Sequence, residues 1–435
     1  AGMNIRNITN FDYLLFLAVI ALSVIGILFI YSSGVNSDGV SVSSEYIKQL
    51  IWVISGVVLL FAVSLYDYNK IGERILLIFI FTMLLLVYTR LFGKNVKGAT
   101  SWIGIGSFGI QVSEFTKIIY ILYLAWYLAR SQNENELRRF IKAAVIMAIP
   151  MFLILLQPDL GTASVYLPIF LIMCFIAGLP LRYVFGLLGI AACTLIFTLL
   201  PLWETSILRR ASLAVKVFGN KNFALLVIFS LTGAAVIAVL GYVLLKRKYY
   251  YWIGYVLGIV AVSFAGALVG SRKLQDYQMK RLIIFLDPNS DPRGAGWNII
   301  QSMTAIGSGG RTGLGFLKGT QSHYRFLPEQ STDFIFSILS EEWGFLGGLL
   351  VFALYAIIFL RIFLIIKKTN DLFGKLIASG VVGMLFFHFI VNIGMVMGFM
   401  PITGIPLLFL SYGGSSLWTA MIAVGLVIGI SLRQL

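Results

Sequence analysis

Long apolar stretches separated by short polar segments dominate this chain of 435 residues. Twelve of them approach the ~20 apolar residues that an α-helix needs to cross a bilayer. They lie at 12–32, 46–66, 74–92, 113–130, 140–157, 160–178, 181–201, 223–246, 249–270, 335–366, 376–399 and 405–432. The pattern predicts an all-α polytopic membrane protein with about twelve transmembrane helices.

The alternation is interrupted once, between the ninth and tenth stretches. Residues 271–333 are polar and rich in glycine and proline, and they contain several ionisable side chains. A loop of this length within an otherwise apolar chain is typical of a functional segment. We therefore expect the site to lie on this loop, ahead of the last three helices.

Lysine and arginine are distributed unevenly among the short loops. They follow the even-numbered stretches, as in Lys246-Arg247-Lys248, whereas residues 33–45 contain none. Cytoplasmic loops carry the excess of positive charge in membrane proteins. The distribution thus predicts cytoplasmic termini and an extracytoplasmic loop 271–333.

Composition agrees with a membrane protein, since 59% of the residues are hydrophobic and 12% are charged. The net charge of +15 could indicate nucleic acid, but no basic array interleaved with aromatic residues accompanies it. Basic residues on an outer loop instead favour an anionic partner, either lipid headgroups or a lipid-linked phosphate. Residues 207–218 also have the pattern of an amphipathic helix at the membrane surface.

Several polar residues lie within or beside the apolar stretches. Glu114 and Lys117 are three residues apart, so they share a helix face and can form an ion pair. Such a pair is either structural or part of a substrate site. Asp159 lies in a short hairpin and can cap the helix that follows it.

The last two apolar stretches also contain polar positions. His388 and Asn392 are four residues apart and are expected to hydrogen-bond inside the bundle, with a proton relay as the alternative. The small residues of Ser411-Tyr412-Gly413-Gly414-Ser415 interrupt the final stretch and allow another backbone to approach closely.

The polar loop contains two Asp-Pro pairs, at Asp287 and Asp291, and a glycine-rich run at 307–315. Asp-Pro dipeptides form rigid turns, and a rigid turn also holds a carboxylate well for general-base catalysis. The glycine-rich run lacks the lysine and the preceding strand of a Walker motif. Its backbone amides could still surround a phosphate.

Several ordered motifs resemble the SEDS family (shape, elongation, division, sporulation), and Gly319-Thr320-Gln321-Ser322 resembles its elongation branch. The other matching motifs are Gln111-x-Ser113-Glu114-x-x-Lys117, Gln157 through Thr162, Asp291-Pro292-x-Gly294-x-Gly296, Phe326-Leu327-Pro328-Glu329, Thr332 through Phe336, Asn392-Ile393-Gly394 and Pro406 through Ser415.

The chain departs from this family at two motif positions and in its number of spans. Val112 stands where the family has proline, and Ser101 stands where it has an arginine before the tryptophan. The family usually has ten spans. The resemblance implies one integral-membrane domain, 3–435, and the difference in span number means either that two helices are inserted within 181–248 or that twelve is an overcount.

The resemblance implies a peptidoglycan glycosyltransferase on the outer face of the bacterial inner membrane. Such an enzyme polymerises lipid II during cell elongation and works with a class B penicillin-binding protein. Asp291 is expected to act as the general base. No metal ligands are expected, and a divalent cation is left open. The implied substrate-binding residues are Glu114, Lys117, Arg281, Arg293, Gln301, Ser302, Lys318, Gln321, Glu329 and Ser411.

Two other functions remain compatible with the sequence. A flippase or other transporter of the same lipid is favoured by the many spans and by the Glu114–Lys117 pair. A non-catalytic scaffold for a transpeptidase is the third reading. The long outer loop and the lack of recognisable repeats count against a transporter.

Overall fold

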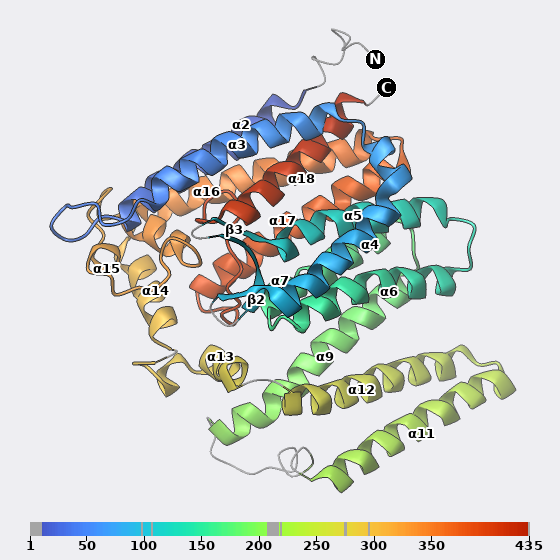
Figure 1. Ribbon diagram of the computed structural model, residues 1–435. Helices are drawn as coiled ribbons and strands as arrows, with labels where there is room; N and C mark the ends of the chain where they lie inside the picture. The colour runs from blue at the N-terminus through green and yellow to red at the C-terminus, as the bar shows by residue number, and fades with distance from the viewer. Residues whose placement is uncertain are drawn as a thin grey trace. The chain divides into compact units, whose positions relative to one another are not determined.

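A computed structural model gives the architecture and describes residues 11–96, 99–105, 108–206, 217, 220–273, 276–294 and 296–433. The fold is built almost entirely of helices, and ten of the described helices are long and apolar enough to cross a membrane (Figure 1). The prediction of an all-α polytopic membrane protein is confirmed.

Each of the twelve predicted spans contains helix, but two of them fall outside these ten. Helix α6 (Glu136–Leu155) begins with several charged residues, and the stretch at 160–176 is divided into the short helices α7 (Leu160–Ser164) and α8 (Tyr166–Ile176). The final helix α18 (Gly414–Leu432) also starts nine residues later than expected, because residues 401–413 form an irregular loop.

The chain divides into two compact units, of which the first contains residues 1–179 and 298–435. Its remaining helices are α2 (Tyr13–Ser33), α3 (Glu45–Leu65), α4 (Tyr68–Phe92), α5 (Val112–Arg130), α14 (Trp297–Ser308), α15 (Thr320–His323), α16 (Ile335–Lys368) and α17 (Leu372–Val396). Helix α18 packs on α3, α16 on α2, and α17 on both α5 and α8.

The centre of this first unit lies around α5, α17 and α18. In these helices 67%, 72% and 78% of the apolar window is buried, against 28% in α3 and α4. Asp371 caps α17 by accepting hydrogen bonds from the Phe373 and Gly374 amides, at 3.1 and 2.9 Å. Polar side chains on the central helices therefore lie in the interior of the unit.

A small antiparallel sheet, which the sequence analysis did not predict, leads into α5. Strands β1 (Lys94–Val96), β2 (Ala99–Ile105) and β3 (Phe108–Gln111) follow one another in order. Trp102 pairs with Gln111, the last residue of β3 and the residue before α5. The sheet thus fixes the start of α5, where the predicted polar cluster begins.

The second unit contains residues 180–297. Its elements are α9 (Leu181–Ser206), α11 (Lys221–Leu245), α12 (Lys248–Lys273), α13 (Asp276–Leu286) and the 3-10 turn η1 (Pro288–Ser290). Helix α12 packs on both α9 and α11, but only 11% of the apolar window of α9 and of α11 is buried. The predicted amphipathic helix at 207–218 falls almost entirely outside the described residues.

Candidate functional site

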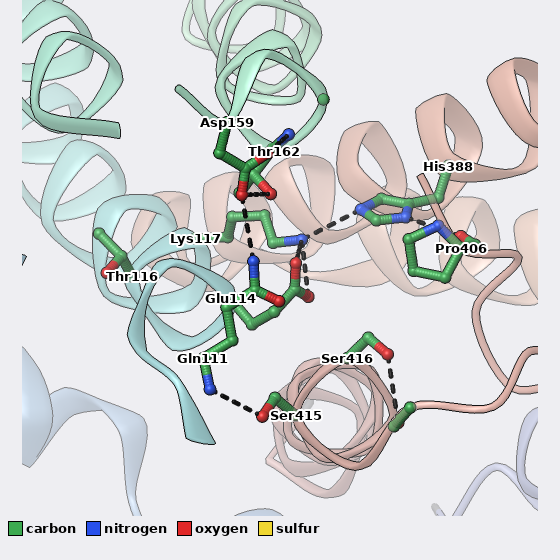
Figure 2. A network of polar contacts seen from close by, with 12 residues as sticks. Gln111, Glu114, Thr116, Lys117, Asp159, Thr162, His388, Pro406, Ser415 and Ser416 are labelled. Atoms are coloured by element: carbon green, nitrogen blue, oxygen red, sulfur yellow. Dashed lines mark hydrogen bonds and ion pairs between the residues drawn. The ribbon is translucent and has the colours of Figure 1, made fainter. Parts of the chain in front are cut away.

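Lys117 lies at the centre of a buried polar network in the first unit (Figure 2). Its ammonium group donates to both carboxylate oxygens of Glu114, each at 2.8 Å, and to Nε2 of His388 at 3.1 Å. Nδ1 of His388 then donates to the carbonyl oxygen of Pro406 at 3.0 Å. The ammonium group is thus paired with a carboxylate and an imidazole nitrogen in the buried interior of the unit.

A second chain of contacts joins the start of α5 to two other segments. The side-chain amide of Gln111 donates to Asp159 at 3.1 Å, and its backbone amide donates to Oγ of Ser415 at 3.0 Å. Asp159 accepts from the backbone amide and the hydroxyl of Thr162, at 2.9 and 2.8 Å. Asp159 therefore caps α7, as predicted.

The irregular loop 401–413 is held by side chains from neighbouring elements. Asn392 donates to the carbonyl oxygens of Asp333 and Ile405, at 2.9 and 2.8 Å. Ser411 accepts from the Leu407 amide at 2.9 Å, and its carbonyl oxygen accepts from Gln49 at 3.2 Å. Asn392 and His388 hydrogen-bond inside the bundle as expected. Ser411, a predicted substrate contact, is buried, and its hydrogen bonds stabilise the loop.

Glu341, a fully buried carboxylate that the sequence analysis did not select, holds the segment around α15 in place. It accepts hydrogen bonds from the Thr320 hydroxyl at 3.0 Å and from the amides of Gln321 and Ser322, at 2.8 and 3.3 Å. These three donors form the start of α15. The carboxylate therefore caps that short helix from a different part of the chain.

Glu342 is also fully buried, and it joins the same loop to α2. One of its oxygens accepts from the Leu317 amide at 3.1 Å, and the other accepts from the Ser32 hydroxyl and lies 3.5 Å from Nε2 of His323. His323 donates through Nδ1 to the carbonyl oxygen of Val35 at 2.9 Å. Two adjacent glutamates thus fix both the loop and its attachment to the bundle.

Helix α16 is broken at Gly344, where φ is 62° and ψ is −158°. The glycine-rich run supplies replacement hydrogen bonds to the freed backbone groups. The amides of Leu314 and Gly315 donate to the carbonyl oxygens of Glu341 and Glu342, each at 3.0 Å. In return, the amides of Phe345 and Leu346 donate to the carbonyl oxygens of Gly310 and Arg311, at 2.9 and 3.1 Å.

The hydrogen bonds across the break in α16 also bear on whether the glycine-rich run at 307–315 could surround a phosphate. The amides of Gly313, Leu314 and Gly315 are all engaged in backbone hydrogen bonds, so they are not free to surround an anion. Glycine is required at the junction, because a Cβ at Gly313 would lie 2.0 Å from the carbonyl oxygen of Glu342. The run serves to complete a broken helix.

The two Asp-Pro turns lie in the second unit, directly after α13. Asp287 accepts from the Asn289 amide at 3.0 Å and is half-buried. Asp291 follows η1 and is exposed, and its carbonyl oxygen accepts from the amides of Gly294 and Gly296, at 3.3 and 3.0 Å. A Cβ at Gly294 would lie 2.2 Å from a carboxylate oxygen of Asp291. Glycine there lets the carboxylate lie against the turn.

The remaining predicted residues differ in exposure. Ser302 is buried, lies 2.7 Å from the hydroxyl of Ser337 and donates to the carbonyl oxygen of Val396 at 2.7 Å. Such contacts join α14 to α16 and to the end of α17. Lys318, Arg293 and Glu329 are exposed. Arg281, Gln301 and Gln321 have intermediate exposure.

The predicted site residues therefore fall into two groups. Asp291, Arg281 and Arg293 belong to the second unit, and all the others belong to the first. Within the part of the chain that the structure describes, no group of three or more His, Cys, Asp or Glu side chains could hold a metal ion.

Comparison with known proteins identifies the family. The model of the FtsW, RodA and SpoVE family, described as cell cycle protein, matches residues 12–216 and 210–434. The chain belongs to this family. The two matched segments overlap at 210–216, within the predicted insertion.

Two relatives of known name match along nearly the whole chain, and the more similar of the two is a RodA protein. The chain is 62% identical over 433 residues to the peptidoglycan glycosyltransferase RodA of Treponema pallidum, covering all of both chains. It is 33% identical to the stage V sporulation protein E of Bacillus subtilis, covering 97% of each. The predicted resemblance to the family and to its RodA branch is confirmed.

Solved structures share the fold. One from a study of polymerization and crosslinking by a peptidoglycan synthase complex has a TM-score of 0.66 at 24% identity and covers 97% of each chain. The crystal structure of Thermus thermophilus RodA has a TM-score of 0.60 at 22% identity, covering 98% of this chain and 97% of that one.

Proposed function

We propose that this protein is a peptidoglycan glycosyltransferase that polymerises lipid II into β-1,4 glycan strands and releases undecaprenyl diphosphate. The observation that carries the proposal is the 62% identity, along the whole chain, to a relative named a peptidoglycan glycosyltransferase. The family match over nearly all of the sequence supports the same activity.

The membrane placement is also a proposal. The distribution of lysine and arginine favours cytoplasmic termini, so that loop 271–333 faces outward from the inner membrane. An outward loop meets lipid II on the side where glycan strands are assembled. It would also meet a class B penicillin-binding protein, the proposed partner that crosslinks those strands. The neighbouring structure from a peptidoglycan synthase complex supports a partner of this kind.

Asp291 is the proposed general base. It takes the proton from the 4-hydroxyl group of the acceptor sugar as that oxygen attacks the anomeric carbon of the donor. Undecaprenyl diphosphate leaves with the electron pair of the broken bond, so the α-linked donor becomes a β-1,4 linkage. Exposure of Asp291 in a glycine-braced turn supports this role, because a base must reach its substrate.

The chemistry requires one carboxylate. Diphosphate is a good leaving group when cations stabilise its charge, so the second carboxylic acid that glycosidases use is not needed. Lys318 and Arg293 are exposed and supply positive charge on the segments that carry the proposed site. Arg281, which is half-buried, is a third proposed contact. The engaged ammonium group of Lys117 fits a structural role better.

Polymerisation of purified lipid II by the purified protein tests the proposal directly. We expect glycan strands that a muramidase degrades, and at least ~10²-fold fewer strands from the Asp291→Asn protein. A well-folded wild-type protein that makes no strands, alone or with a class B partner, would contradict the proposal. If a wild-type protein that makes no strands moved lipid II from one leaflet of a liposome membrane to the other, the transporter alternative would be favoured. An absence of both activities would favour a scaffold.

A further inference from the structure

Lys318 lies in a short turn, residues 315–319, between the glycine-rich run and α15. The Lys318 amide closes the turn by donating to the carbonyl oxygen of Gly315 at 3.0 Å. A Cβ at Gly315 would lie 3.3 Å from Cδ of Lys318, so the aliphatic part of the lysine side chain packs along the Gly315 backbone. The turn therefore fixes the backbone of Lys318 and the start of its side chain, while the residue stays exposed.

The backbone of this turn is strained. Leu317, directly before Lys318, has φ of 62°, in the left-handed region that a residue with a Cβ rarely adopts. Burial does not explain the strain, because Leu317 is 38% exposed. A conformation of this kind persists only where surrounding contacts hold it, and such positions are concentrated in ligand-binding and catalytic segments. The contacts that hold Leu317 therefore indicate what the turn is for.

Two buried carboxylates hold the chain on either side of Lys318. Oε2 of Glu342 accepts from the Leu317 amide at 3.1 Å, one residue before the lysine. Oε1 of Glu341 accepts from the Gln321 amide at 2.8 Å, three residues after it. Both glutamates are fully buried and adjacent in α16. One point on a packed helix thus fixes the backbone before and after the lysine.

A backbone that is fixed before the ligand arrives lowers the cost of binding. A lysine on a mobile loop would have to order its backbone and its side chain together when it met an anion, and that ordering opposes binding. Glu341 and Glu342 provide the backbone order during folding. The remaining freedom of Lys318 is that of its side chain beyond the part that packs on Gly315.

We propose that Glu341 and Glu342 are positioning residues that hold Lys318 in place to contact the diphosphate of the lipid substrate. The inference rests on the proposed function, in which Lys318 is one of the cations that bind lipid II. The two glutamates act through the backbone of residues 317–322 and do not touch the ligand. Their effect on ligand binding therefore depends on the presence of the lysine.

A double-mutant cycle tests the proposal, with the dissociation constant of undecaprenyl diphosphate measured on the whole purified chain. Glu342→Met removes the acceptor of the Leu317 amide and should weaken binding about tenfold, as Lys318→Ala should by removing the charge. The double variant should bind no more weakly than Lys318→Ala alone, because a positioning residue has no effect once the positioned group is gone. An additive loss of about a hundredfold would overturn the proposal, and so would full binding by Lys318→Ala.

Glu342→Gln is the conservative variant. Its carbonyl oxygen can still accept from the Leu317 amide, and its NH2 group can donate to the hydroxyl oxygen of Ser32. It should therefore restore most of the binding of undecaprenyl diphosphate that Glu342→Met loses. A loss as large as that of Glu342→Met would contradict positioning through the Leu317 amide.

Gly319→Ala tests the other glutamate and keeps the inference testable if Glu342→Met does not fold. Gly319 has φ of −67° and ψ of 130°, which alanine adopts without strain. Its Cβ would lie 2.7 Å from Oε2 of Glu341, so the substitution displaces that carboxylate. We expect binding of undecaprenyl diphosphate to weaken severalfold in the wild-type background and not at all in the Lys318→Ala background. Equal losses in both backgrounds would contradict the inference.

The matched control is Asp371→Asn, which alters a carboxylate that also accepts from two backbone amides, at the start of α17. It should lower the melting temperature and leave the dissociation constant of undecaprenyl diphosphate unchanged. If binding fell in this control as it does in Gly319→Ala, the losses would reflect general destabilisation and the positioning role would be wrong.

Failure of this inference is distinguishable from failure of the proposed function. Polymerisation of lipid II by the wild type reports on the activity alone, whereas the cycle reports on binding. A protein that polymerises lipid II but gives additive losses keeps its function and loses the positioning role. Non-additive losses in a protein that makes no strands support the positioning role and contradict the function.

Discussion

One ionisable residue from each unit, Lys117 and Asp291, shows the two opposite conditions in which this protein keeps charge. In the first unit Lys117 is 1% exposed, and its ammonium group donates to Glu114 and to His388. In the second unit Asp291 is exposed in a tight turn. Both residues were predicted to belong to the substrate site, and only one of them is placed where a solvent-borne ligand can reach it.

This difference in burial distinguishes charged residues that stabilise the fold from charged residues that are available to bind a ligand or take part in catalysis. A buried ion must be paired, because an isolated charge in an apolar interior costs several kcal/mol. Loss of one partner therefore affects stability first. An exposed charge costs little to keep, so its loss affects binding or chemistry without unfolding the protein. Each prediction below tests one side of this contrast.

Lys117→Met should have the largest effect, on stability. The substitution leaves the Glu114 carboxylate and the His388 ring without their shared partner, at a cost of about 3–5 kcal/mol in the free energy of unfolding. Thermal unfolding in detergent measures the loss.

The control for Lys117 is Lys142→Met, which removes an exposed ion pair with Glu134 at 2.9 Å. This change should cost under about 1 kcal/mol. If Lys117→Met melted like the wild type and failed only in use of lipid II, Lys117 would belong with the ligand-binding charges.

Asp291→Asn should reduce polymerisation of lipid II at least ~10²-fold, the usual scale for loss of a general base. The amide keeps the shape of the side chain, so the melting temperature should be unchanged. Asp287→Asn, in the half-buried neighbouring turn, should do much less. If Asp287→Asn were inactive and Asp291→Asn active, Asp287 would be the general base and Asp291 the turn residue.

Lys318→Ala and Arg293→Ala should each weaken the use of lipid II about ten- to a hundredfold, because a hydrogen bond to a charged phosphate contributes about 1.5–3 kcal/mol. Both side chains are exposed, so stability should be unaffected. Arg247→Ala, on the opposite predicted side of the membrane, is the matched control. Full activity in both variants would exclude these cations from the substrate site.

Asp159→Ala should have the smallest effect, about 1 kcal/mol in stability, since it removes the cap of α7. Asp159→Asn keeps an oxygen that can accept the Thr162 amide, but its NH2 group would face the Gln111 donor, so it should restore the cap and only part of the loss. An equal loss in both variants would mean that the negative charge matters more than the cap.

Local patterns in the sequence predicted much of this architecture. Hydropathy located the helices, the three-residue spacing predicted the Glu114–Lys117 pair, and the Asp159 cap followed from its place before a helix. Each of these features depends on residues that are close together in the chain. The position of the Asp291 turn was also predictable, because its proline and glycines act locally.

Features that depend on distant residues were missed. Glu341 acts on donors about twenty residues earlier, and Glu342 bonds Ser32 from the far end of the chain. One signal was available, since two adjacent carboxylates in an apolar stretch need partners. Nothing in the sequence named those partners. The break at Gly344 was hidden for the same reason, because its hydrogen bonds come from residues 310–315.

That break also has a consequence for the order in which the protein is made. The segment that completes α16 precedes it in the chain, so a ribosome releases the replacement donors and acceptors before the helix that needs them. The 24 residues after Gly344, about 36 Å of helix, are sufficient to cross a bilayer by themselves. We expect this second half to insert first, and the first half to settle when residues 310–315 dock on it.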